Sequence, residues 1–511
     1  MHESAKRIMF QGTSSGAGKS RLATALCRIL HQDGHRVAPF KAQNMALNSY
    51  ITTDGREVGR AQAVQAEAAG VELDVRMNPV LLKPSGNRMT QVIVMGKVYR
   101  NIEAHTYYKM KKEVRPFAEQ AFDEIAREYE YLVMEGAGSP AEINLMEDDF
   151  SNMGIATYAK APVILVADID RGGVFASIYG TVMLLPEEER RLFKGIIINK
   201  FRGRTDTLLS GIEKIEKLTG IPVLGILPYR EDIRIEEEDS LAESLKRTTT
   251  SADIRICVPW TPHLSNFTDF DVLRNYEDVS LTYVKTPAEL QDCDLIILPG
   301  SKNTIEDMKY LEEKGLKEEI LRLHGEGIAL CGICGGYQML GTKILDPLHL
   351  EGDETEIEGF GLLKATTLME EEKITSRVRA KILPVKEEDS VFYIPSEMEV
   401  EGYEIHCGRT EVKEERFSKI IEKSGAKVSL SDGAINSRAN VFGTYLHGIF
   451  DNANFMQAIL NNLRRRKGLA QRQEEEDYRS YKERQYDKLA DEVRKYIDVS
   501  KIYRIMDEGI D

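Results

Sequence analysis

The chain has 511 residues, of which 42% are hydrophobic and 30% charged. At roughly 100–200 residues per domain, this length allows two to four domains, each able to bury a core. The formal net charge of −15 repels a phosphate backbone, so nucleic acid is not an expected partner. We also expect no membrane span, since no run of about 18 apolar residues occurs. The N-terminus lacks a signal-peptide pattern and the six cysteines do not suggest a disulfide framework, which favours a cytoplasmic location.

Short apolar strands alternate with helical segments through the first half of the chain. Residues 20–31 and 117–129 have helical spacing. Such alternation predicts an α/β fold with a mostly parallel sheet covered on both faces. Ligands of such a sheet bind beyond the carboxyl ends of its strands. The strands are expected at residues 7–10, 37–41, 131–134, 162–167, 195–199 and 223–227.

The composition changes near Ser240, and the polar residues 247–251 suggest a linker. A second α/β pattern follows, and the last part of the chain is highly charged with helical spacing near residues 486–497. We interpret that last part as a solvated helical tail packed on one domain. The second set of strands is expected at residues 254–258, 295–299 and 328–331. The predicted domains are residues 1–245, 252–455 and 456–511.

A candidate phosphate-binding loop lies at residues 10–20, Phe-Gln-Gly-Thr-Ser-Ser-Gly-Ala-Gly-Lys-Ser, between the first strand and a helix. This is the setting of a P-loop. Its glycines let backbone N–H groups converge on phosphate oxygens, and the helix N-terminus adds partial positive charge. Lys19 is expected to reach the β- and γ-phosphates and Ser20 to ligate Mg²⁺. An ordinary glycine-rich turn is the alternative, which the ordered strand, loop and helix disfavour.

The glycine spacing of this loop is unusual. Gly12 stands six residues before Gly18, and Thr13 takes the usual first-glycine position, a variant typical of dethiobiotin-synthetase-like enzymes. Asn199 ends a later strand, and Arg202 stands where guanine readers carry Asp, so adenine is the expected base; a simple strand-end turn is the alternative for Asn199. The residues expected to bind ATP are Gly12, Thr13, Gly16, Gly18, Lys19, Ser20 and Asn199.

Acidic residues at two strand ends are candidate partners of Mg²⁺. Glu135 directly follows the apolar run Tyr-Leu-Val-Met, where an acidic Mg²⁺ partner or a water-ordering group belongs. Asp168 and Asp170 follow the next strand and could do the same, or could simply cap a loop or helix. Ser20 and Glu135 are therefore the predicted metal ligands.

A candidate nucleophile elbow lies in the second half, where Gly332-Ile-Cys334-Gly-Gly336 follows an apolar strand. A tight strand-to-helix turn projects the central side chain, and a helix N-terminus favours a reactive thiolate. The backbone N–H of Gly335 is expected to form an oxyanion hole. A second donor is expected from the glycine loop at residues 299–303, at Gly300.

The nucleophile Cys334 needs a base, and His447 is the first candidate, since it ends an apolar stretch and is followed by glycine. His406 is the second candidate, and either histidine could instead be structural. Cys331 and Cys334 also form a C-x-x-C pair that could be redox-active or bind zinc with His406 and Cys407. No second C-x-x-C exists and the elbow glycines have no role in a zinc site, so Cys331 is interpreted as a buried strand residue.

Together the two motifs predict one coupled reaction. ATP activates a carboxylate as an acyl phosphate, glutamine hydrolysis through a Cys334 thioester releases ammonia, and ammonia attacks the acyl phosphate to give an amide. Free ammonia is mostly ammonium at neutral pH, which explains why both sites would lie in one chain.

Beyond these motifs, nearly the whole chain resembles the cobyric acid synthase family of corrinoid (vitamin B12) biosynthesis. The most specific stretch is Gln-Asn-Met-Ala-Leu-Asn at residues 43–48, supported by residues 77–84, 135–145, 168–175, 298–304, 402–406 and 445–448. The resemblance implies ATP- and glutamine-dependent amidation of the b, d, e and g carboxylates of adenosylcobyrinic acid a,c-diamide. It implies ATP as co-substrate with Mg²⁺, no tightly bound organic cofactor, and Cys334 and His447 as glutaminase nucleophile and base.

This sequence departs from the pattern of related enzymes at two points. Many glutaminases carry His-Pro-Glu, but Gly448 and Ile449 follow His447, so the usual orienting Glu is missing. Gly16 stands where many relatives carry Asp. The alternatives are a cobyrinic acid a,c-diamide synthase, an amidotransferase acting on another polyacid, or a ParA- or MinD-like ATPase switch with an inactive second domain. Such switches carry a lysine early in the loop, which is absent here.

Overall fold

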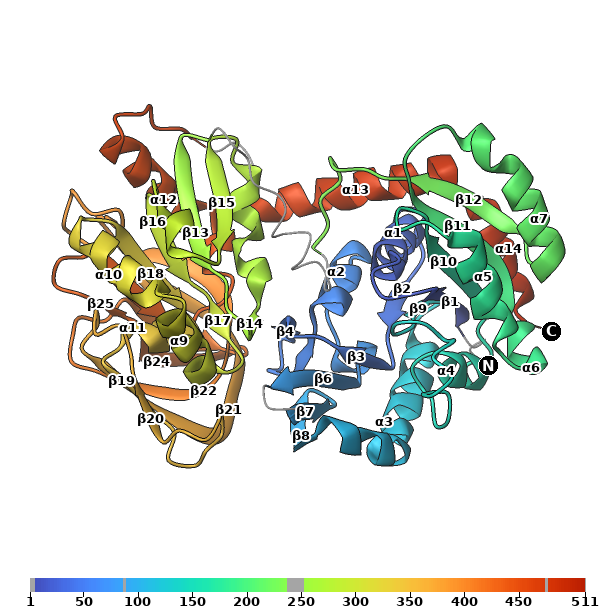
Figure 1. The fold of residues 1–511 in the computed structure, drawn as a ribbon, viewed down its shortest axis with the longest axis horizontal. Helices are drawn as coiled ribbons and strands as arrows, with labels where there is room; N and C mark the ends of the chain where they lie inside the picture. Colours follow the sequence, from blue (N-terminus) through green and yellow to red (C-terminus); the bar gives the residue numbers. More distant parts are fainter. Residues whose placement is uncertain (1–4, 86–88, 237–251, 474–476, 511) are drawn as a thin grey trace.

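The computed structural model describes residues 5–85, 89–236, 252–473 and 477–510, which form two lobes (Figure 1). One lobe contains the candidate phosphate loop and the other contains the candidate elbow. The linker predicted at residues 247–251 lies outside the described residues. Among the described helices, none is long and apolar enough to span a membrane.

The first lobe is built on a six-stranded parallel sheet, and all six predicted strands are confirmed. Their order across the sheet is β12 (Val223–Pro228), β11 (Phe193–Phe201), β10 (Val163–Asp168), β1 (Lys6–Gly12), β9 (Tyr131–Glu135) and β2 (Val37–Phe40). Side chains alternate across the sheet, as the two-residue period of a strand requires. In β1, Ile8 and Phe10 enter the core on one face and Met9 the core on the other.

Helices cover both faces of this sheet, as expected for a parallel sheet. The predicted helix at 20–31 is α1 (Lys19–Gln32), and its residues pack with Ile8 and Phe10. On the other face lies α3 (Tyr107–Glu128), which begins ten residues before the predicted segment and passes through Pro116. Further helices in the described part of this lobe are α4 (Met153–Tyr158), α5 (Val174–Met183), α6 (Glu187–Arg190), η3 (Thr205–Leu208) and α7 (Leu209–Thr219).

A small insertion between β2 and α3 faces the second lobe and was not predicted (Figure 1). It contains a four-stranded sheet, a two-stranded hairpin and α2 (Arg60–Ala68). The four strands are β3 (Gln43–Met45), β6 (Val80–Ser85), β7 (Met89–Val94) and β8 (Lys97–Glu103). The hairpin strands are β4 (Ser49–Ile51) and β5 (Glu57–Gly59), and η1 (Val75–Met77) and η2 (Ala104–Thr106) complete the insertion.

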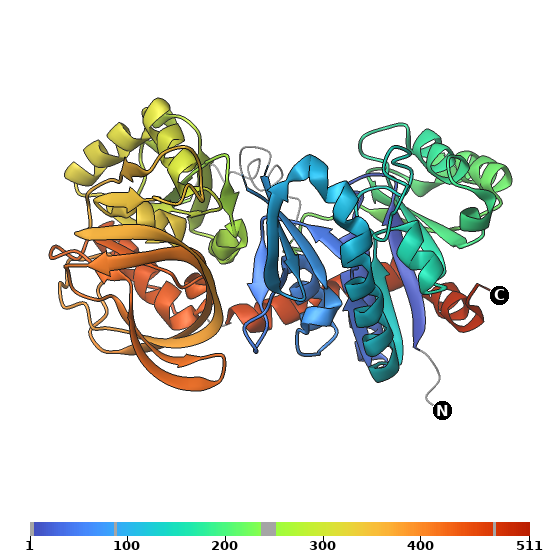
Figure 2. The same ribbon diagram turned by 90° about the horizontal axis from the view of Figure 1, so that it is seen from below.

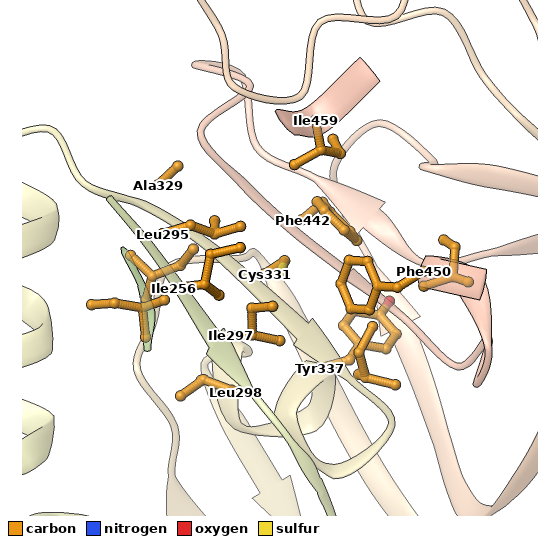
Figure 3. Close-up of a cluster of buried hydrophobic side chains, with 14 of the residues drawn as sticks. Ile256, Leu295, Ile297, Leu298, Ala329, Cys331, Tyr337, Phe442, Phe450 and Ile459 are labelled. Atoms are coloured by element: carbon orange, nitrogen blue, oxygen red, sulfur yellow. The ribbon is translucent and has the colours of Figure 1, made fainter. Parts of the chain in front are cut away.

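The second lobe contains another mainly parallel sheet, and the three strands predicted there are confirmed. Its order is β15 (Val279–Val284), β13 (Ile254–Pro259), β16 (Leu295–Leu298), β18 (Ala329–Ile333), β26 (Val441–Thr444) and β25 (Ala434–Ile435), the last pair being antiparallel. Figure 3 shows its buried core, with Cys331 between Ile256 and Phe442. Further elements are β14 (Leu264–Ser265), η4 (Phe267–Asn275), η5 (Pro287–Leu290), β17 (Gly300–Ser301), α9 (Thr304–Glu313), α10 (Leu316–Gly325), α11 (Gly335–Leu340) and η6 (Ile449–Asp451).

A curved, mostly antiparallel sheet covers one side of this lobe (Figure 2). Its strands are β19 (Lys343–Leu345), β20 (Glu356–Glu358), β21 (Ala365–Ile382), β22 (Met398–Val412), β23 (Ser418–Lys423) and β24 (Ala426–Asp432). The long hairpin of β21 and β22 places residues 403–406 beside the candidate elbow, because the Cys334 thiol contacts the Ile405 carbonyl oxygen at 3.5 Å.

The C-terminal helices contact both lobes, whereas we expected a tail on one domain. The apolar side of α12 (Ala453–Arg466) packs in the core of the second lobe through Ile459 and Leu460. The long helix α13 (Tyr478–Tyr496) then runs to the first lobe (Figure 1), where Leu489 packs with α1. The last helix, α14 (Val499–Glu508), packs there as well. The expectation was wrong because the charged face of α13 dominates its composition and conceals a narrow apolar stripe.

Candidate active site

The phosphate loop has the geometry of a P-loop at the carboxyl end of β1. Gly18 adopts φ 100°, a conformation that favours glycine, and a Cβ there would lie 2.0 Å from Asn199 Nδ2. Lys19 Nζ donates to the carbonyl oxygens of Ser14 at 3.2 Å and Gly138 at 2.9 Å. The ammonium group is therefore held across the mouth of the loop, where phosphate oxygens could replace these carbonyl acceptors.

Glu135 lies beside the loop and is fully buried. Its carboxylate accepts hydrogen bonds from Ser20 Oγ at 2.8 Å, Lys41 Nζ at 2.9 Å and Gln65 Nε2 at 2.7 Å. Burial raises the pKa of this carboxyl group, but the neighbouring ammonium groups, first that of Lys41, outweigh burial and hold the pKa below its usual value. Ser20 and Glu135 thus place two hard oxygen ligands side by side. This pair suits Mg²⁺, whose remaining coordination positions phosphate oxygens and water would fill.

The other predicted nucleotide residues lie nearby, but their side chains are already engaged. The amide of Asn199 donates to the Ala17 carbonyl oxygen at 2.9 Å, so it supports the phosphate loop. Asp168 lies 3.3 Å from Lys200 Nζ, and Asp170 accepts from Arg202 Nε at 2.9 Å. These two acids are ion-paired with side chains of the β11 end rather than bonded to Ser20.

A cavity of about 810 Å³ opens at the phosphate loop, within the range typical of ligand sites. Its floor is formed by the loop from Thr13 to Ser20 and by Glu135. Its outer wall comes from the insertion and from α3. This wall includes Gln43, Asn44, Met45, Tyr107, Tyr108 and Lys111.

Cys334 lies between β18 and α11 in the geometry of a nucleophile elbow. Its φ of 54° with ψ of −107° is a strained backbone conformation for a residue with a side chain. Small neighbours are required here, because a Cβ on Gly336 would lie 2.1 Å from the Leu298 carbonyl oxygen. The first turn of α11 directly follows Cys334, as the strand-to-helix turn of an elbow requires.

His447 is buried, and Cys334 lies near enough to affect the protonation of its ring. Its other ring nitrogen, Nδ1, lies 2.6 Å from Asp269 Oδ2, and the Gly448 N–H donates to Asp269 Oδ1 at 3.2 Å. Burial lowers the pKa of His447, but the Asp269 carboxylate, and after it the nearby Cys334, outweigh burial and raise the pKa to about 10. Asp269 thus takes the position of the orienting acid that the sequence after His447 lacks.

The candidate oxyanion hole lies between Gly335 and the loop at residues 299–303. A Cβ on Gly335 would lie 2.7 Å from the backbone nitrogen of Ser301, so the two amides are close together. The Lys302 N–H donates to the His263 carbonyl oxygen, and Gly300 pairs with Ser265 two residues along the same antiparallel ladder. Hydrogen-bonded positions alternate in such a ladder, so the N–H of Ser301, rather than that of Gly300, points away from it.

The second histidine and the C-x-x-C pair have other surroundings. The ring of His406 stacks on Tyr445 at 3.7 Å and its Nδ1 lies 2.7 Å from the Gly408 carbonyl oxygen. Cys331 is enclosed by the apolar core, where burial raises the pKa of its thiol far above the usual value (Figure 3). Among the described residues there is no cluster of His, Cys, Asp and Glu that could hold a metal ion.

Two family models match the chain. The CobQ/CobB/MinD/ParA nucleotide binding domain matches residues 8–242, and the CobB/CobQ-like glutamine amidotransferase domain matches residues 255–455. The PurLQS structure from Thermotoga maritima is 22% identical over 41% of this chain and 99% of its own, with a TM-score of 0.32. That score is too low to support an argument about this fold.

Curated relatives align with almost the entire chain. Cobyric acid synthase from Thermoanaerobacter sp. (strain X514) is 49% identical over 98% of this chain and 99% of its own. Cobyric acid synthase from Streptococcus sanguinis (strain SK36) is 50% identical with the same coverage. That from Salmonella choleraesuis (strain SC-B67) is 50% identical over 98% of both chains. The chain therefore belongs to the cobyric acid synthase family and is a glutamine-hydrolysing amidotransferase, a carbon–nitrogen ligase.

Proposed function

We propose that this enzyme amidates the b, d, e and g carboxylates of adenosylcobyrinic acid a,c-diamide, using ATP and glutamine. In this proposal residues 1–245 form the amides, residues 252–455 release ammonia, and residues 456–511 tie the two lobes together. The observation that supports it most is the buried Cys334–His447–Asp269 arrangement in the same chain as a P-loop cavity.

The first lobe binds ATP and activates the carboxylate. A carboxylate oxygen of the corrinoid attacks the γ-phosphorus of ATP, ADP leaves, and an acyl phosphate forms. Lys19 stabilises the charge on the transferring phosphoryl group, and the loop amides hold the β-phosphate. Ser20 and Glu135 would hold Mg²⁺, which when bound neutralises charge on the phosphate oxygens. The other residues proposed to bind ATP are Gly12, Thr13, Gly16, Gly18 and Asn199.

The second lobe hydrolyses glutamine in two steps. His447 takes the proton of the Cys334 thiol, and the thiolate attacks the side-chain amide carbon of glutamine. The N–H groups of Gly335 and Ser301 stabilise the oxyanion, a role that Ser301 fills better than the predicted Gly300. The leaving ammonia receives the proton from His447. Water, deprotonated by His447, then breaks the thioester and releases glutamate.

The cavity of the first lobe suits an acyl phosphate intermediate. Ammonia attacks the acyl carbon, phosphate leaves, and the carboxylate has become a carboxamide. The exposed side chain of Met45 and the rings of Tyr107 and Tyr108 offer an apolar wall for the corrin, while Lys111 can attract its remaining carboxylates. The acidic net charge of the chain makes such a local basic group necessary for an anionic substrate.

The test is a reaction of purified protein with ATP, Mg²⁺, glutamine and adenosylated cobyrinic acid a,c-diamide, followed by product mass and released glutamate. We expect stepwise carboxyl-to-amide mass losses that stop after the fourth. The Cys334→Ala variant should work with ammonium salts but not with glutamine, because only the ammonia supply is lost. Glutamine and ATP hydrolysis without any change in the corrinoid would contradict the substrate assignment.

The rival functions are not favoured. The curated relatives that match the full chain at about 50% identity are named cobyric acid synthase, not a,c-diamide synthase. An ATPase switch with an inactive second domain has no use for an elbow cysteine beside a buried His–Asp pair.

A further inference from the structure

One short segment of the first lobe contacts both candidate sites. Residues Gln43, Asn44 and Met45 of β3 line the cavity at the phosphate loop. Only Ala46 and Leu47 separate them from Asn48 and Ser49, which are buried against the second lobe. A stretch of this length spans at most about 11 Å, so the cavity wall and the contact with the second lobe lie close together along one short piece of chain.

The far end of this segment binds the turn that precedes Asp269. Asn48 Oδ1 accepts a hydrogen bond from the Phe267 N–H at 3.2 Å. The Ser49 N–H donates to Asn266 Oδ1 at 3.1 Å. Asn266 and Phe267 are buried, and Asn266 adopts the left-handed conformation with φ 52°. A strained turn of this kind keeps its shape only while its surroundings hold it.

This part of the second lobe contacts both ring nitrogens of His447, through Asn266 and Asp269. Asn266 Nδ2 lies 3.5 Å from His447 Nε2, the nitrogen on the side opposite the Asp269 bond. Because Asn266 Oδ1 is bonded to the Ser49 N–H, its amide must present the NH₂ group to the histidine. Without Ser49 the amide could rotate and place its oxygen there instead. Asp269 follows three residues later in η4, so its position depends on the same turn.

We propose that residues 43–49 couple the filling of the synthetase cavity to the glutaminase, with Asn48 and Asn266 as positioning residues for His447. When ATP and the corrinoid bind in the cavity and contact Gln43–Met45, the segment holds Asn266 and Asp269 in the orientation in which His447 activates Cys334. Glutamine is then hydrolysed mainly when an acceptor is present, which avoids wasting ammonia. This inference rests on the proposed function.

The test compares glutamine hydrolysis in wild type, Asn48→Ala, Asn266→Ala and Thr375→Val. Thr375 is the matched control. Its hydroxyl donates across the same lobe boundary to the Gly55 carbonyl oxygen at 2.8 Å, but it is not part of the contacts that join β3 to His447. Each protein is assayed alone, with Mg²⁺ and ATP, and with Mg²⁺, ATP and adenosylated cobyrinic acid a,c-diamide. Thermal melting and amidation driven by ammonium salts are measured in parallel.

We expect the substrates of the first lobe to stimulate wild type and Thr375→Val alike. In Asn48→Ala and Asn266→Ala the stimulation should vanish and the stimulated kcat for glutamine should fall about 2- to 10-fold, the effect of one lost hydrogen bond. The KM for glutamine and the ammonium-driven amidation should stay near wild type. A merely structural role would instead lower the melting temperature and both activities together.

Two results would overturn the coupling. One is a wild type whose glutamine hydrolysis does not respond to ATP and corrinoid, and the other is a pair of variants that respond as wild type does. Ammonium-driven amidation keeps this outcome separate from the proposed function. If wild type forms no amide from ammonium salts, the proposed substrate is wrong, and the response of glutamine hydrolysis to Mg²⁺ and ATP alone still decides the coupling.

Discussion

Replacing Asp269 by Asn tests the orienting acid that the sequence did not reveal. The change removes the carboxylate that lies 2.6 Å from His447 Nδ1 while keeping the size of the side chain. A hydrogen bond to a charged group contributes about 1.5–3 kcal/mol, so kcat for glutamine should fall about 10- to 150-fold. Amidation driven by ammonium salts should be unchanged, because the first lobe does not use His447.

The pH dependence of Asp269→Asn follows from the same contact. The carboxylate raises the pKa of His447, so its removal lowers that pKa, and the alkaline limb of kcat should move to lower pH. A raised histidine pKa also stabilises the folded protein below the unfolded value of about 6.5, and this contribution is lost as the pH rises through about 10. The variant should lack that pH-dependent part in thermal melts.

The matched control for this prediction is Asp271→Asn. Asp271 lies in the same short helix, η4, as Asp269. Its Oδ1 pairs with Arg274 Nε at 3.6 Å, not with His447. It should keep kcat and the pH profile of wild type. Wild-type kcat and an unmoved alkaline limb in Asp269→Asn would show that Asp269 does not orient or charge His447.

Three further changes have separable outcomes. Lys19→Ala should lower ammonium-driven amide formation, measured by ADP release, by roughly 100-fold or more. Basal glutamine hydrolysis, measured by glutamate release, should persist. An equal loss of both activities would contradict the role of Lys19 in the first lobe alone. Gly336→Ala places a Cβ 2.1 Å from the Leu298 carbonyl oxygen and should cost about 1–3 kcal/mol in a denaturant melt, whereas Gly325→Ala has open space and should not. Glu57→Gln leaves two buried lysines of the lobe boundary without their carboxylate and should cost about 3–5 kcal/mol; an unchanged melt would refute that.

The same Glu57 group predicts acid sensitivity of the wild-type lobe boundary. Burial raises its pKa, but Lys373 and Lys83 outweigh burial and hold the pKa below the ordinary value. A lowered carboxyl pKa stabilises the folded protein above the unfolded value of about 4.5, and this contribution is lost as the pH falls below it. Melting curves from pH 6 downwards should therefore converge for wild type and Glu57→Gln. Parallel curves at all pH values would contradict this.

Local motifs, whose residues are neighbours in the chain, could be predicted from the sequence. The phosphate loop and the cysteine elbow both combine a strand, a glycine turn and a helix, so their residues are neighbours in the chain. Their geometry agrees with that interpretation at Lys19, Gly18 and Cys334. The strands of both parallel sheets were equally visible, because buried strands are short continuous apolar runs.

Features made by distant residues could not be predicted in this way. Asp269 lies 178 positions before His447, and no motif joins them. Its only signal is its place shortly after the first strand of the second lobe, at the carboxyl edge where ligands of such sheets bind. Strands β3, β4 and β5 have three residues each, too few for a period to be recognised. The choice of Ser301 over Gly300 required the register of a two-residue ladder.

In the proposed reaction, ammonia made at Cys334 is used at the P-loop cavity of the same chain. The most direct measurement supplies glutamine labelled with ¹⁵N in its side-chain amide, together with unlabelled ammonium, and determines the isotope in the corrinoid product. We predict that the new carboxamides contain ¹⁵N in wild type and only ¹⁴N in Cys334→Ala. A wild-type product with only ¹⁴N would show that ammonia from Cys334 does not reach the P-loop cavity, and a corrinoid of unchanged mass would contradict the proposed substrate.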